Sequence, residues 1–310
     1  MKNVLVTGAS SGIGLATART LSAAGYRVFV GVRRLPDNPE ILRPVLLDVT
    51  KADSLRSAFA EIENTLRGEP LHALVNNAGI GSLRPLEGTP LDQIRDVFEV
   101  NVFGVIAVTQ TFLPLLRRAP GRIVNIGSIG GLFGLPFASS LCASKHAVEA
   151  LSDALRLELW TSGIRVILIE PASINSGAAE KIAAQTEKTL ADLSPADQVR
   201  YGSLLRHATK VMVESETRGS PPEVVAQAVR EMLEADDPPA RHVTGKDGHL
   251  LNFVARFLPT RLRDHLLRKK FLGNPAWGGT GLLVIARGAQ ASARTRTRRR
   301  QFPRRHLGAA

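Results

Sequence analysis

Glycine residues follow the first apolar run of the chain closely, in the segment T-G-A-S-S-G-I-G. Glycine adopts left-handed turns and lets backbone N–H groups approach a phosphate, and the N-terminus of a following helix adds partial positive charge. The spacing G-x-x-x-G-x-G differs from the general fingerprint G-x-G-x-x-G, and a bare glycine pattern also fits a structural turn. Because the segment lies between a predicted strand and a predicted helix, we expect it to hold the pyrophosphate of a dinucleotide, through Gly8, Ser10, Ser11, Gly12, Ile13 and Gly14.

Two arginines end the second apolar run, where NAD-binding sites usually carry an acid for the ribose 2′-hydroxyl. The chain reads G-V-R-R there, so Val32 leaves no carboxylate to repel a 2′-phosphate, and Arg33 and Arg34 offer bidentate donors to it. This pattern favours NADP (NADPH) over NAD as cofactor, with solvated surface charge as the simpler explanation. We expect Asp48 and Val49, after the third run, to contact the cofactor. Asp48 has two interpretations: it accepts a bond from the adenine amino group, or it caps the next helix.

Four further motifs follow in order: N-N-A-G at 76–79, E-V-N-V-F-G with Asn101, I-G-S-I-G-G with Ser128, and S-L-C-A-S-K-H with Lys145. Together with the glycine segment, this combination resembles the short-chain dehydrogenase/reductase family over residues 1 to about 270. The resemblance implies an Asn, Ser, Tyr and Lys tetrad beside the nicotinamide ribose, at Asn101, Ser128, position 141 and Lys145. It also implies cofactor contacts from Asn76, Ala78, Gly79, Lys145, Pro171, Ile174 and Ser176.

Position 141 is Leu, which departs from the family's Y-x-x-x-K pattern. That spacing places Tyr and Lys on one helix face, where the ammonium lowers the pKa of the phenol. Leu141 neither donates nor accepts a proton, and general acid–base catalysis is worth about 10² to 10⁴ in rate. Tyr26 and Tyr201 are the only tyrosines, so no register shift restores the pattern, and Tyr201 reaching the site from a covering segment is the remaining alternative.

The resemblance implies an NADP(H)-dependent oxidoreductase whose activity is weak or absent. In it, Asn101 supports a water relay to Lys145, Ser128 positions the substrate oxygen, and Lys145 binds the ribose. The alternative function is a non-catalytic NADP(H)-binding sensor or interaction module. Family members with a similar C-terminal extension act on steroids, retinoids and other apolar alcohols, which points to a hydrophobic ketone or secondary alcohol and to lipid or steroid metabolism. The family commonly associates through helices at about 90–118 and 138–162, which implies a homodimer or homotetramer. No metal site is indicated.

The elements that position these residues alternate regularly along the chain. Amphipathic helical stretches separate short runs rich in Val, Ile and Leu, and such alternation predicts right-handed crossovers and a parallel sheet. We therefore expect an α/β fold with a doubly wound parallel sheet (Rossmann-like) in a single domain. The apolar runs lie at 3–6, 27–32, 44–48, 71–76, 121–127, 164–170 and 241–245, and the helical stretches at 12–24, 51–66, 90–118, 138–162 and 221–235.

Two segments fall outside this alternation. Residues from about 172–220 have no strand pattern, which predicts a helical insertion that covers the substrate. Residues 249–272 are amphipathic and basic, so they either pack their apolar stripe over the substrate mouth, the favoured interpretation, or lie on an anionic membrane surface. We expect the domain to cover 1–272 and residues 273–310 to form a basic, disordered tail.

Composition and charge limit the classes of protein to which the chain can belong. The chain has 310 residues, of which 44% are hydrophobic and 22% charged, as in globular proteins. No apolar run of 18 residues and no secretory signal is present, and the lone Cys142 forms no intramolecular disulfide, so we expect a cytoplasmic protein, peripheral to a membrane at most. Eleven basic residues and no acid follow Asp264, which leaves residues 1–264 with a net charge of +1. This basic end predicts weak contact with polyanions or membranes, without specific nucleic-acid recognition.

Overall fold

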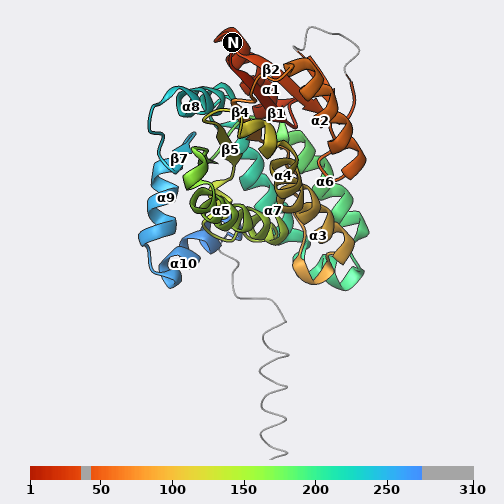
Figure 1. Ribbon diagram of the computed structural model, residues 1–310. Helices are drawn as coiled ribbons and strands as arrows, with labels where there is room; N and C mark the ends of the chain where they lie inside the picture. The colour runs from red at the N-terminus through yellow and green to blue at the C-terminus, as the bar shows by residue number, and fades with distance from the viewer. Residues whose placement is uncertain (36–42, 274–310) are drawn as a thin grey trace, which may run out of the picture. The chain divides into compact units, whose positions relative to one another are not determined.

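A seven-stranded parallel sheet forms the centre of the protein (Figure 1). The computed structural model describes residues 1–35 and 43–273. Strand order is β3-β2-β1-β4-β5-β6-β7, so the order reverses between β1 and β4, where doubly wound sheets bind ligands. The predicted fold class is confirmed. The strands are β1 (Asn3–Thr7), β2 (Arg27–Val32), β3 (Arg43–Leu46), β4 (Ala73–Asn76), β5 (Arg122–Ile126), β6 (Arg165–Pro171) and β7 (Arg241–Thr244).

Helices cover both faces of the sheet (Figure 1). The crossover helices are α1 (Gly12–Ala23), α2 (Ala52–Leu66), α3 (Leu91–Phe98), α4 (Gly104–Leu116), α5 (Ser139–Glu158) and α8 (Glu223–Glu234). The segment between β6 and α8 forms α6 (Ala178–Asp192) and α7 (Pro195–Thr217), which pack on each other, as the predicted helical insertion requires. After β7 come α9 (Gly248–Phe257) and α10 (Thr260–Phe271), separated at Pro259.

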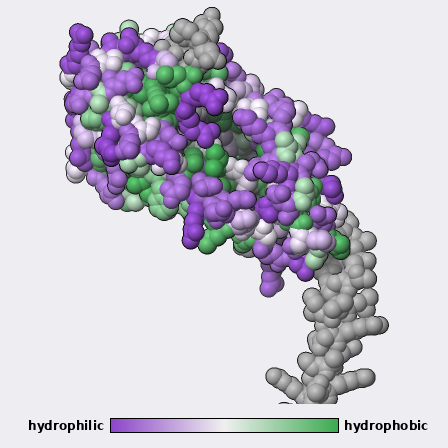
Figure 2. Space-filling model, turned by 90° about the vertical axis from the view of Figure 1, so that its right-hand side faces the viewer, coloured by the Kyte–Doolittle hydropathy of each residue, from purple (hydrophilic) through white to green (hydrophobic). Residues whose placement is uncertain are grey.

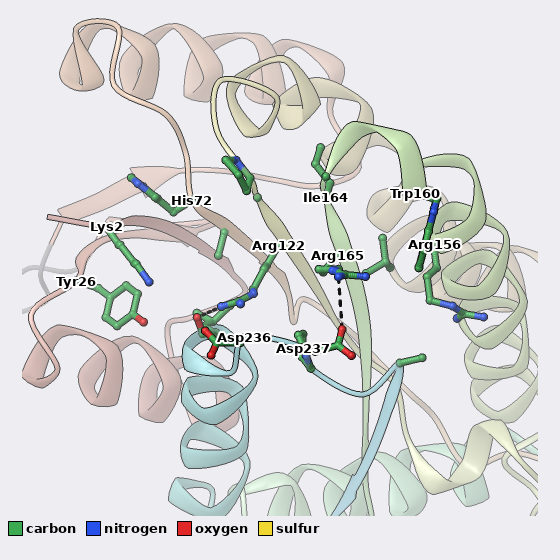
Figure 3. Close-up of a pocket in the computed structure, with 18 residues that line it drawn as sticks. Lys2, Tyr26, His72, Arg122, Arg156, Trp160, Ile164, Arg165, Asp236 and Asp237 are labelled. Carbon is green, nitrogen blue, oxygen red and sulfur yellow. Dashed lines mark hydrogen bonds and ion pairs between the residues drawn. The ribbon is translucent and has the colours of Figure 1, made fainter.

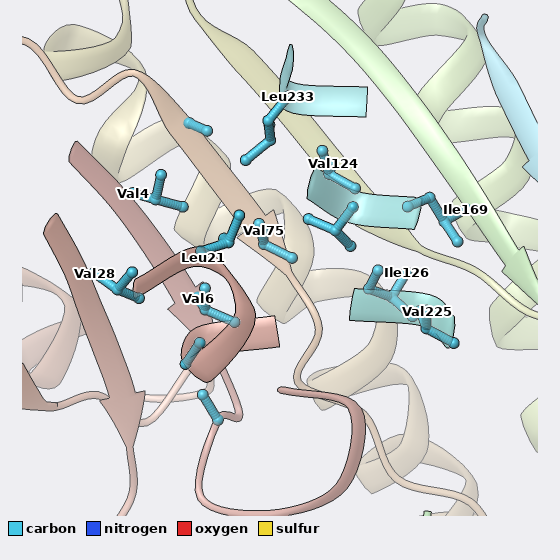
Figure 4. Close-up of a cluster of buried hydrophobic side chains, with 14 of the residues drawn as sticks. Val4, Val6, Leu21, Val28, Val75, Val124, Ile126, Ile169, Val225 and Leu233 are labelled. Atoms are coloured by element: carbon cyan, nitrogen blue, oxygen red, sulfur yellow. The ribbon is translucent and has the colours of Figure 1, made fainter. Parts of the chain in front are cut away.

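The strand period of two divides the core into two layers. On β1, Val4 and Val6 enter the cluster shared with α1 and α8, shown in Figure 4, whereas Leu5 enters the cluster on the opposite face. Leu21 of α1 and Val225 of α8 belong to the first cluster. Because both faces of β1 are buried, its register with its neighbours is fixed, and with it the position of the glycine segment that follows.

The helix predicted over 90–118 is interrupted. Glu99–Phe103 form a π-helix between α3 and α4, and Asn101 lies at its centre. Leu91–Leu116 is long and apolar enough to cross a membrane by length and composition. Its residues Phe112 and Leu115 are fully buried in the core against α2 and the sheet, which accounts for this apolar character.

Residues Met1–Leu272 form one compact unit. The predicted tail lies outside the described residues from 274 onward.

Candidate functional site

The glycine segment after β1 packs against the end of β4. Gly8 has φ of +63°, and a Cβ at this position would lie 2.7 Å from the Cα of Ala78. A Cβ on Gly14 would lie 2.5 Å from the carbonyl oxygen of Gly8. Glycine is therefore required at both positions, because the turn is left-handed at Gly8 and closely packed at Gly14.

The N-terminus of α1 faces the loop that follows β6. Ser11 is the N-cap residue of α1, yet no side chain caps the helix, so its first N–H groups are available to an anion. A Cβ on Gly12, whose φ is +54°, would lie 3.0 Å from the carbonyl oxygen of Ser176. The structure thus brings Gly12 and Ser176 together, although 164 positions separate them in sequence. Ser10 and Ser11 are exposed beside them, whereas Pro171 and Ile174 are buried.

Two polar residues that we did not predict hold this loop in place. The Oγ1 of Thr7 accepts hydrogen bonds from the N–H groups of Asn77 (3.0 Å) and Ala78 (3.1 Å). The side-chain amide of Asn77 donates to the carbonyls of Thr7 (2.9 Å) and Gly8 (3.0 Å). The sequence signal that could have identified Thr7 and Asn77 is their position next to Gly8 and Ala78 in the two motifs. Strands β1 and β4, which flank the reversal of strand order, are joined here by side chains.

Arg33 and Arg34 are exposed directly after β2. Asp48 lies nearby: desolvation opposes its ionisation, but hydrogen bonds from Thr50 and the charge of Arg33 lower the pKa of Asp48 below its usual range. The Oδ1 of Asp48 accepts from the N–H (3.0 Å) and hydroxyl (2.7 Å) of Thr50, two residues before α2. These bonds close a turn within residues 48–50, whereas the N-cap residue of α2 is Lys51 and no side chain caps the helix, so the capping interpretation is wrong. The adenine contact stays a prediction, and Val49 is buried beside Gly104.

Asn101 fixes the segment after N-N-A-G. Its Oδ1 accepts from the N–H of Ile80 (2.8 Å), and its Nδ2 donates to the carbonyl of Ile80 (2.8 Å) and to Oγ of Ser144 (2.9 Å). A Cβ on Gly79 would lie 3.4 Å from Oδ1 of Asn101 and 3.8 Å from Nζ of Lys145. Gly79, Asn101 and Lys145 therefore meet at one point, and Ser144 is a further residue that sequence reasoning missed.

Ser128 and Lys145 lie at the carboxyl end of β5. The hydroxyl of Ser128 accepts from the N–H of Gly130 (3.0 Å), which leaves its own proton to donate. The Nζ of Lys145 donates to the carbonyl of Ile126 (2.7 Å). Burial lowers the pKa of Lys145 to about 8. Each side chain thus presents a polar hydrogen toward the end of the strand.

Leu141 lies one helical turn before Lys145 on α5. Its Cδ2 and Cδ1 lie 3.0 and 3.2 Å from where a Cβ on Gly81 would stand. It is half-buried, and the neighbouring cluster of Cys142, Leu190 and Leu205 packs the covering insertion onto the start of α5. Figure 2 shows that the face bearing α2, α3 and α6 is hollowed near its middle, with both hydrophobic and hydrophilic side chains around the hollow. Methyl groups therefore occupy the place where the family's phenol is expected.

The side chains of Asn76 and Tyr201 make their contacts away from the tetrad positions. The amide of Asn76 is buried and donates to Thr109 (3.1 Å) and Asn125 (2.9 Å), so its side chain ties β4 to α4 and β5. Tyr201 packs edge-on against Phe137, with ring centroids 6.2 Å apart. No hydrogen bond joins Tyr201 to the tetrad positions in the part of the chain that the structure describes.

A groove of about 810 Å³ opens at the amino ends of the strands, away from this site (Figure 3). Its arginines hold the connection between α8 and β7. Arg122 donates to the carbonyls of Leu233 and Ala235, and Arg165 pairs with Asp237 at 3.4 Å. The charged residues of this groove therefore have a structural role, which is to hold the connection between α8 and β7.

Together, the glycine cradle, the uncapped helix N-terminus and the closing loop at Ser176 fit a dinucleotide cofactor. Comparison with known proteins agrees. The short chain dehydrogenase family profile matches residues 2–187. Estradiol 17-beta-dehydrogenase 2 of Mus musculus is 33% identical over 290 residues, covering 88% of this chain and 76% of that protein. The NADPH-dependent 3-dehydrocapnine reductase of Ornithobacterium rhinotracheale is 32% identical, covering 87% of this chain and 97% of that protein.

A solved structure shows the same likeness. A short-chain dehydrogenase from Streptomyces avermitilis superposes with a TM-score of 0.66 at 28% identity, and the match covers 97% of this chain and 98% of that one. The family resemblance inferred from the motifs is thereby confirmed. The chain belongs to the short-chain dehydrogenase/reductase family.

Proposed function

We propose that this protein is an NADP(H)-dependent oxidoreductase that acts slowly on a hydrophobic ketone or secondary alcohol. The observation that carries the proposal is the meeting of Gly79, Asn101 and Lys145 at the end of the cofactor cleft, beside Leu141. The family binds NAD(P) and transfers hydride. The donors that hold the cofactor are present, and the proton donor is replaced.

The preference for the phosphorylated cofactor rests on Arg33 and Arg34. Both guanidinium groups are exposed at the carboxyl end of β2, one strand away from the glycine cradle on β1. Two planar cations offer several donors to the dianionic 2′-phosphate of NADP, and no carboxylate follows Val32 to repel it. A relative's name also specifies NADPH. NAD is the weaker candidate.

A bound nicotinamide would supply or accept the hydride. On the protein side, Ser128 donates its free hydroxyl proton to the substrate oxygen, because its lone pair already accepts from Gly130. Lys145 holds ribose hydroxyls with its ammonium. Asn101 anchors Ile80 and Ser144 and supports a water relay to Lys145. Proton transfer then relies on water, which predicts a rate about 10² to 10⁴ below that of a site with a phenol.

The substrate class follows from the covering insertion. Leu190 on α6, Leu193 directly after it and Leu205 on α7 pack with Leu83 and Ala138 in a buried cluster at the start of α5, so the insertion makes the surroundings of this end of the sheet apolar. An apolar ketone or alcohol enters such surroundings at little cost in free energy, whereas a charged substrate would lose its favourable hydration. The relatives' names include estradiol.

Assembly into a homodimer or homotetramer is supported by exposed apolar side chains on two long helical stretches. Phe103, just before α4, is 53% exposed, and Leu157 on α5 is 70% exposed. Both lie on the stretches through which the family commonly associates.

The second candidate function is a non-catalytic NADP(H)-binding module. Leu141 favours it directly, since methyl groups stand where the reaction needs a proton donor. In that case the cofactor cleft serves sensing or interaction, and turnover is absent.

The deciding experiment compares the natural chain with Leu141→Tyr and Leu141→Phe. NADPH binding is measured by fluorescence titration, and hydride transfer with a panel of apolar ketones by NADPH absorbance. We expect all three chains to bind NADPH and Leu141→Tyr alone to gain rate by about 10² or more. Leu141→Phe adds the ring without the hydroxyl and controls for shape.

The two candidates then separate. Slow turnover by the natural chain supports the oxidoreductase. Absence of any turnover, with NADPH still bound, supports the binding module. Failure of the natural chain to bind NADPH contradicts both functions.

A further inference from the structure

Helix α9 is apolar on two neighbouring faces. Leu251, Val254 and Leu258 are half-buried against the fold, where α9 packs on β7 and on the turn Ile129–Gly131. On the neighbouring face, Leu250, Phe253 and Phe257 lie together at i, i+3 and i+7 and are 63%, 54% and 69% exposed. The rings of Phe253 and Phe257 pack together with centroids 5.3 Å apart. The first face packs against the protein, and the second contacts no other element within the described residues.

Helix α10 repeats this arrangement. Leu267 and Phe271 point toward the fold, where α10 packs on α7, and Phe271 is buried. Leu262 and Leu266, one turn apart, are 50% and 43% exposed. We call the exposed side chains of both helices the α9–α10 surface: Leu250, Phe253, Phe257, Leu262 and Leu266. In Figure 1 the two helices form the outer edge of the molecule beyond β7.

Positive charge surrounds these apolar side chains. Residues 248–272 contain six arginines and lysines and one acid, Asp264, a net charge of +5. Arg261, Arg268 and Lys269 are exposed and form no ion pair with any residue that the structure describes. Exposed phenylalanine and leucine on helices with a basic rim are the composition of helices that lie in the interface of an anionic bilayer.

The charge also argues against two other occupants. A second copy of the chain meeting the same surface would oppose two patches of net charge +5, and like charges across an interface cost binding energy. The segment 274–310 contains eight arginines and no acid, so it is repelled by the same charge. An anionic lipid surface is complementary to both the apolar and the charged parts.

We propose that α9 and α10 form a docking surface for an anionic lipid bilayer, with Phe253 and Phe257 inserted below the headgroups. The surface adjoins the site on two sides. Helix α9 packs on the turn that follows Ser128, and Arg256 reaches the buried Glu170 (3.6 Å), one residue before Pro171. Docking places the site beside the bilayer, which is the source of an apolar substrate. This last step rests on the proposed function, whereas docking itself does not.

An environment-sensitive fluorophore on single cysteines tests insertion in the full chain. Phe253→Cys and Phe257→Cys carry the probe on the α9–α10 surface. Leu46→Cys is the matched control, because Leu46 is 52% exposed on β3, at the opposite edge of the sheet. The native Cys142 is 3% exposed, so folded protein leaves it unlabelled, which labelling of the natural chain verifies.

With vesicles of phosphatidylcholine and phosphatidylserine, we expect blue-shifted, brighter emission at positions 253 and 257 and no change at 46. Vesicles of phosphatidylcholine alone should give a smaller change. If the chain co-sediments with the mixed vesicles while the probes at 253 and 257 stay unchanged, binding comes from the basic C-terminal end and the proposal is wrong. A change that grows with protein concentration without vesicles assigns the surface to a second copy and also overturns it.

Partitioning of unlabelled variants gives an independent readout. Phe253→Ser combined with Phe257→Ser should lower the vesicle partition coefficient at least about tenfold, because the variant loses the apolar surface that would be buried below the headgroups. Leu46→Ser should leave it unchanged. Both phenylalanines are exposed, so thermal melting should match the natural chain and NADPH binding should persist. Equal partitioning of the double variant and the natural chain would contradict insertion, whatever the outcome for the proposed enzymatic function.

Discussion

The ammonium of Lys145 donates to the backbone carbonyl of Ile126, with Nζ and O 2.7 Å apart. Ile126 is the last residue of β5, so the strand end itself positions the lysine. Among the described residues no carboxylate pairs with Lys145, and burial lowers its pKa to about 8. Its charge is therefore available to a cofactor near neutral pH and is lost on mild alkalinisation.

NADPH affinity should consequently fall as the pH rises above 8. Below that pH the free protein already carries the ammonium, and above it binding must recruit a proton, which weakens affinity by up to about tenfold per pH unit. Titration of NADPH fluorescence from pH 7 to 9.5 measures the effect. Lys145→Arg keeps its charge over this range and should give a flat profile. An equally flat profile for the natural chain would show that Lys145 does not sense the cofactor.

Arg33→Ala should weaken NADPH binding about 10- to 100-fold and leave NADH binding nearly unchanged. The reason is that a charge-assisted hydrogen bond contributes about 1.5–3 kcal/mol and only NADPH carries the 2′-phosphate. Calorimetric titration of both cofactors gives the ratio. Arg117→Ala, at an exposed arginine after α4, serves as the matched loss of one positive charge. Equal losses for both cofactors would assign Arg33 to surface charge.

Much of the fold was predictable because its signals are local. Strands buried on both faces read as continuous apolar runs, as in β1 and β6, and helices separate them at regular intervals. The π-helix at Asn101 was not predicted, because its five residues are too few to change the apolar periodicity of the longer helical stretch around them. What fixes it is tertiary: the side chain of Asn101 bonds to the backbone of Ile80, which the sequence places 21 positions away.

The site residues that belong to a known motif were predictable from the sequence. The residues whose roles depend on tertiary contacts were less predictable. Thr7, Asn77 and Ser144 lie next to or within the motifs, yet their roles depend on hydrogen bonds between strands and helices distant in sequence. The segment 249–272 had two interpretations from its pattern alone. In the structure Phe253 and Phe257 are exposed whereas Phe271 is buried, and the choice between the two interpretations stays a prediction. The amino-acid pattern does not show which apolar face of the helix packs against the edge of the sheet, because tertiary contacts decide this.

Two buried carboxyl groups meet between α5 and β6. Glu170 is fully buried, and Glu149 is 9% exposed and bonds to Arg241 (3.1 Å). Neither oxygen of Glu170 has a hydrogen-bond partner among the described residues, although Arg256 lies 3.6 Å away. Burial, with the neighbouring charge of Glu170, raises the pKa of Glu149 to about 7. The fold therefore holds a proton on Glu149 that the unfolded chain releases at lower pH.

This raised pKa predicts that stability falls as the pH increases. The native state binds more protons than the unfolded state between about pH 4.5 and 7, so the contribution of Glu149 is complete below this window and lost above it. Glu149→Gln mimics the protonated acid and should gain on the order of 2 kcal/mol relative to the natural chain between pH 5 and pH 8. Urea unfolding at both pH values measures it. Glu61→Gln, on the exposed face of α2, should show no such difference; a pH-independent effect of Glu149→Gln would refute the raised pKa of Glu149.

Gly8 and Gly25 allow backbone strain to be separated from the packing that builds the cofactor cleft. Both have positive φ, +63° and +85°, and alanine at either position costs about 1–2 kcal/mol in backbone energy. A Cβ on Gly25 would meet nothing within 4 Å, whereas one on Gly8 would lie 2.7 Å from the Cα of Ala78. Gly8→Ala must therefore push the loop away from the end of β4, and NADPH affinity should drop at least about tenfold, beyond the shared loss of stability. Gly25→Ala should melt earlier yet bind NADPH normally. If both variants keep full affinity, the contact between Gly8 and Ala78 does not shape the cofactor cleft, and the cradle assignment loses its structural basis.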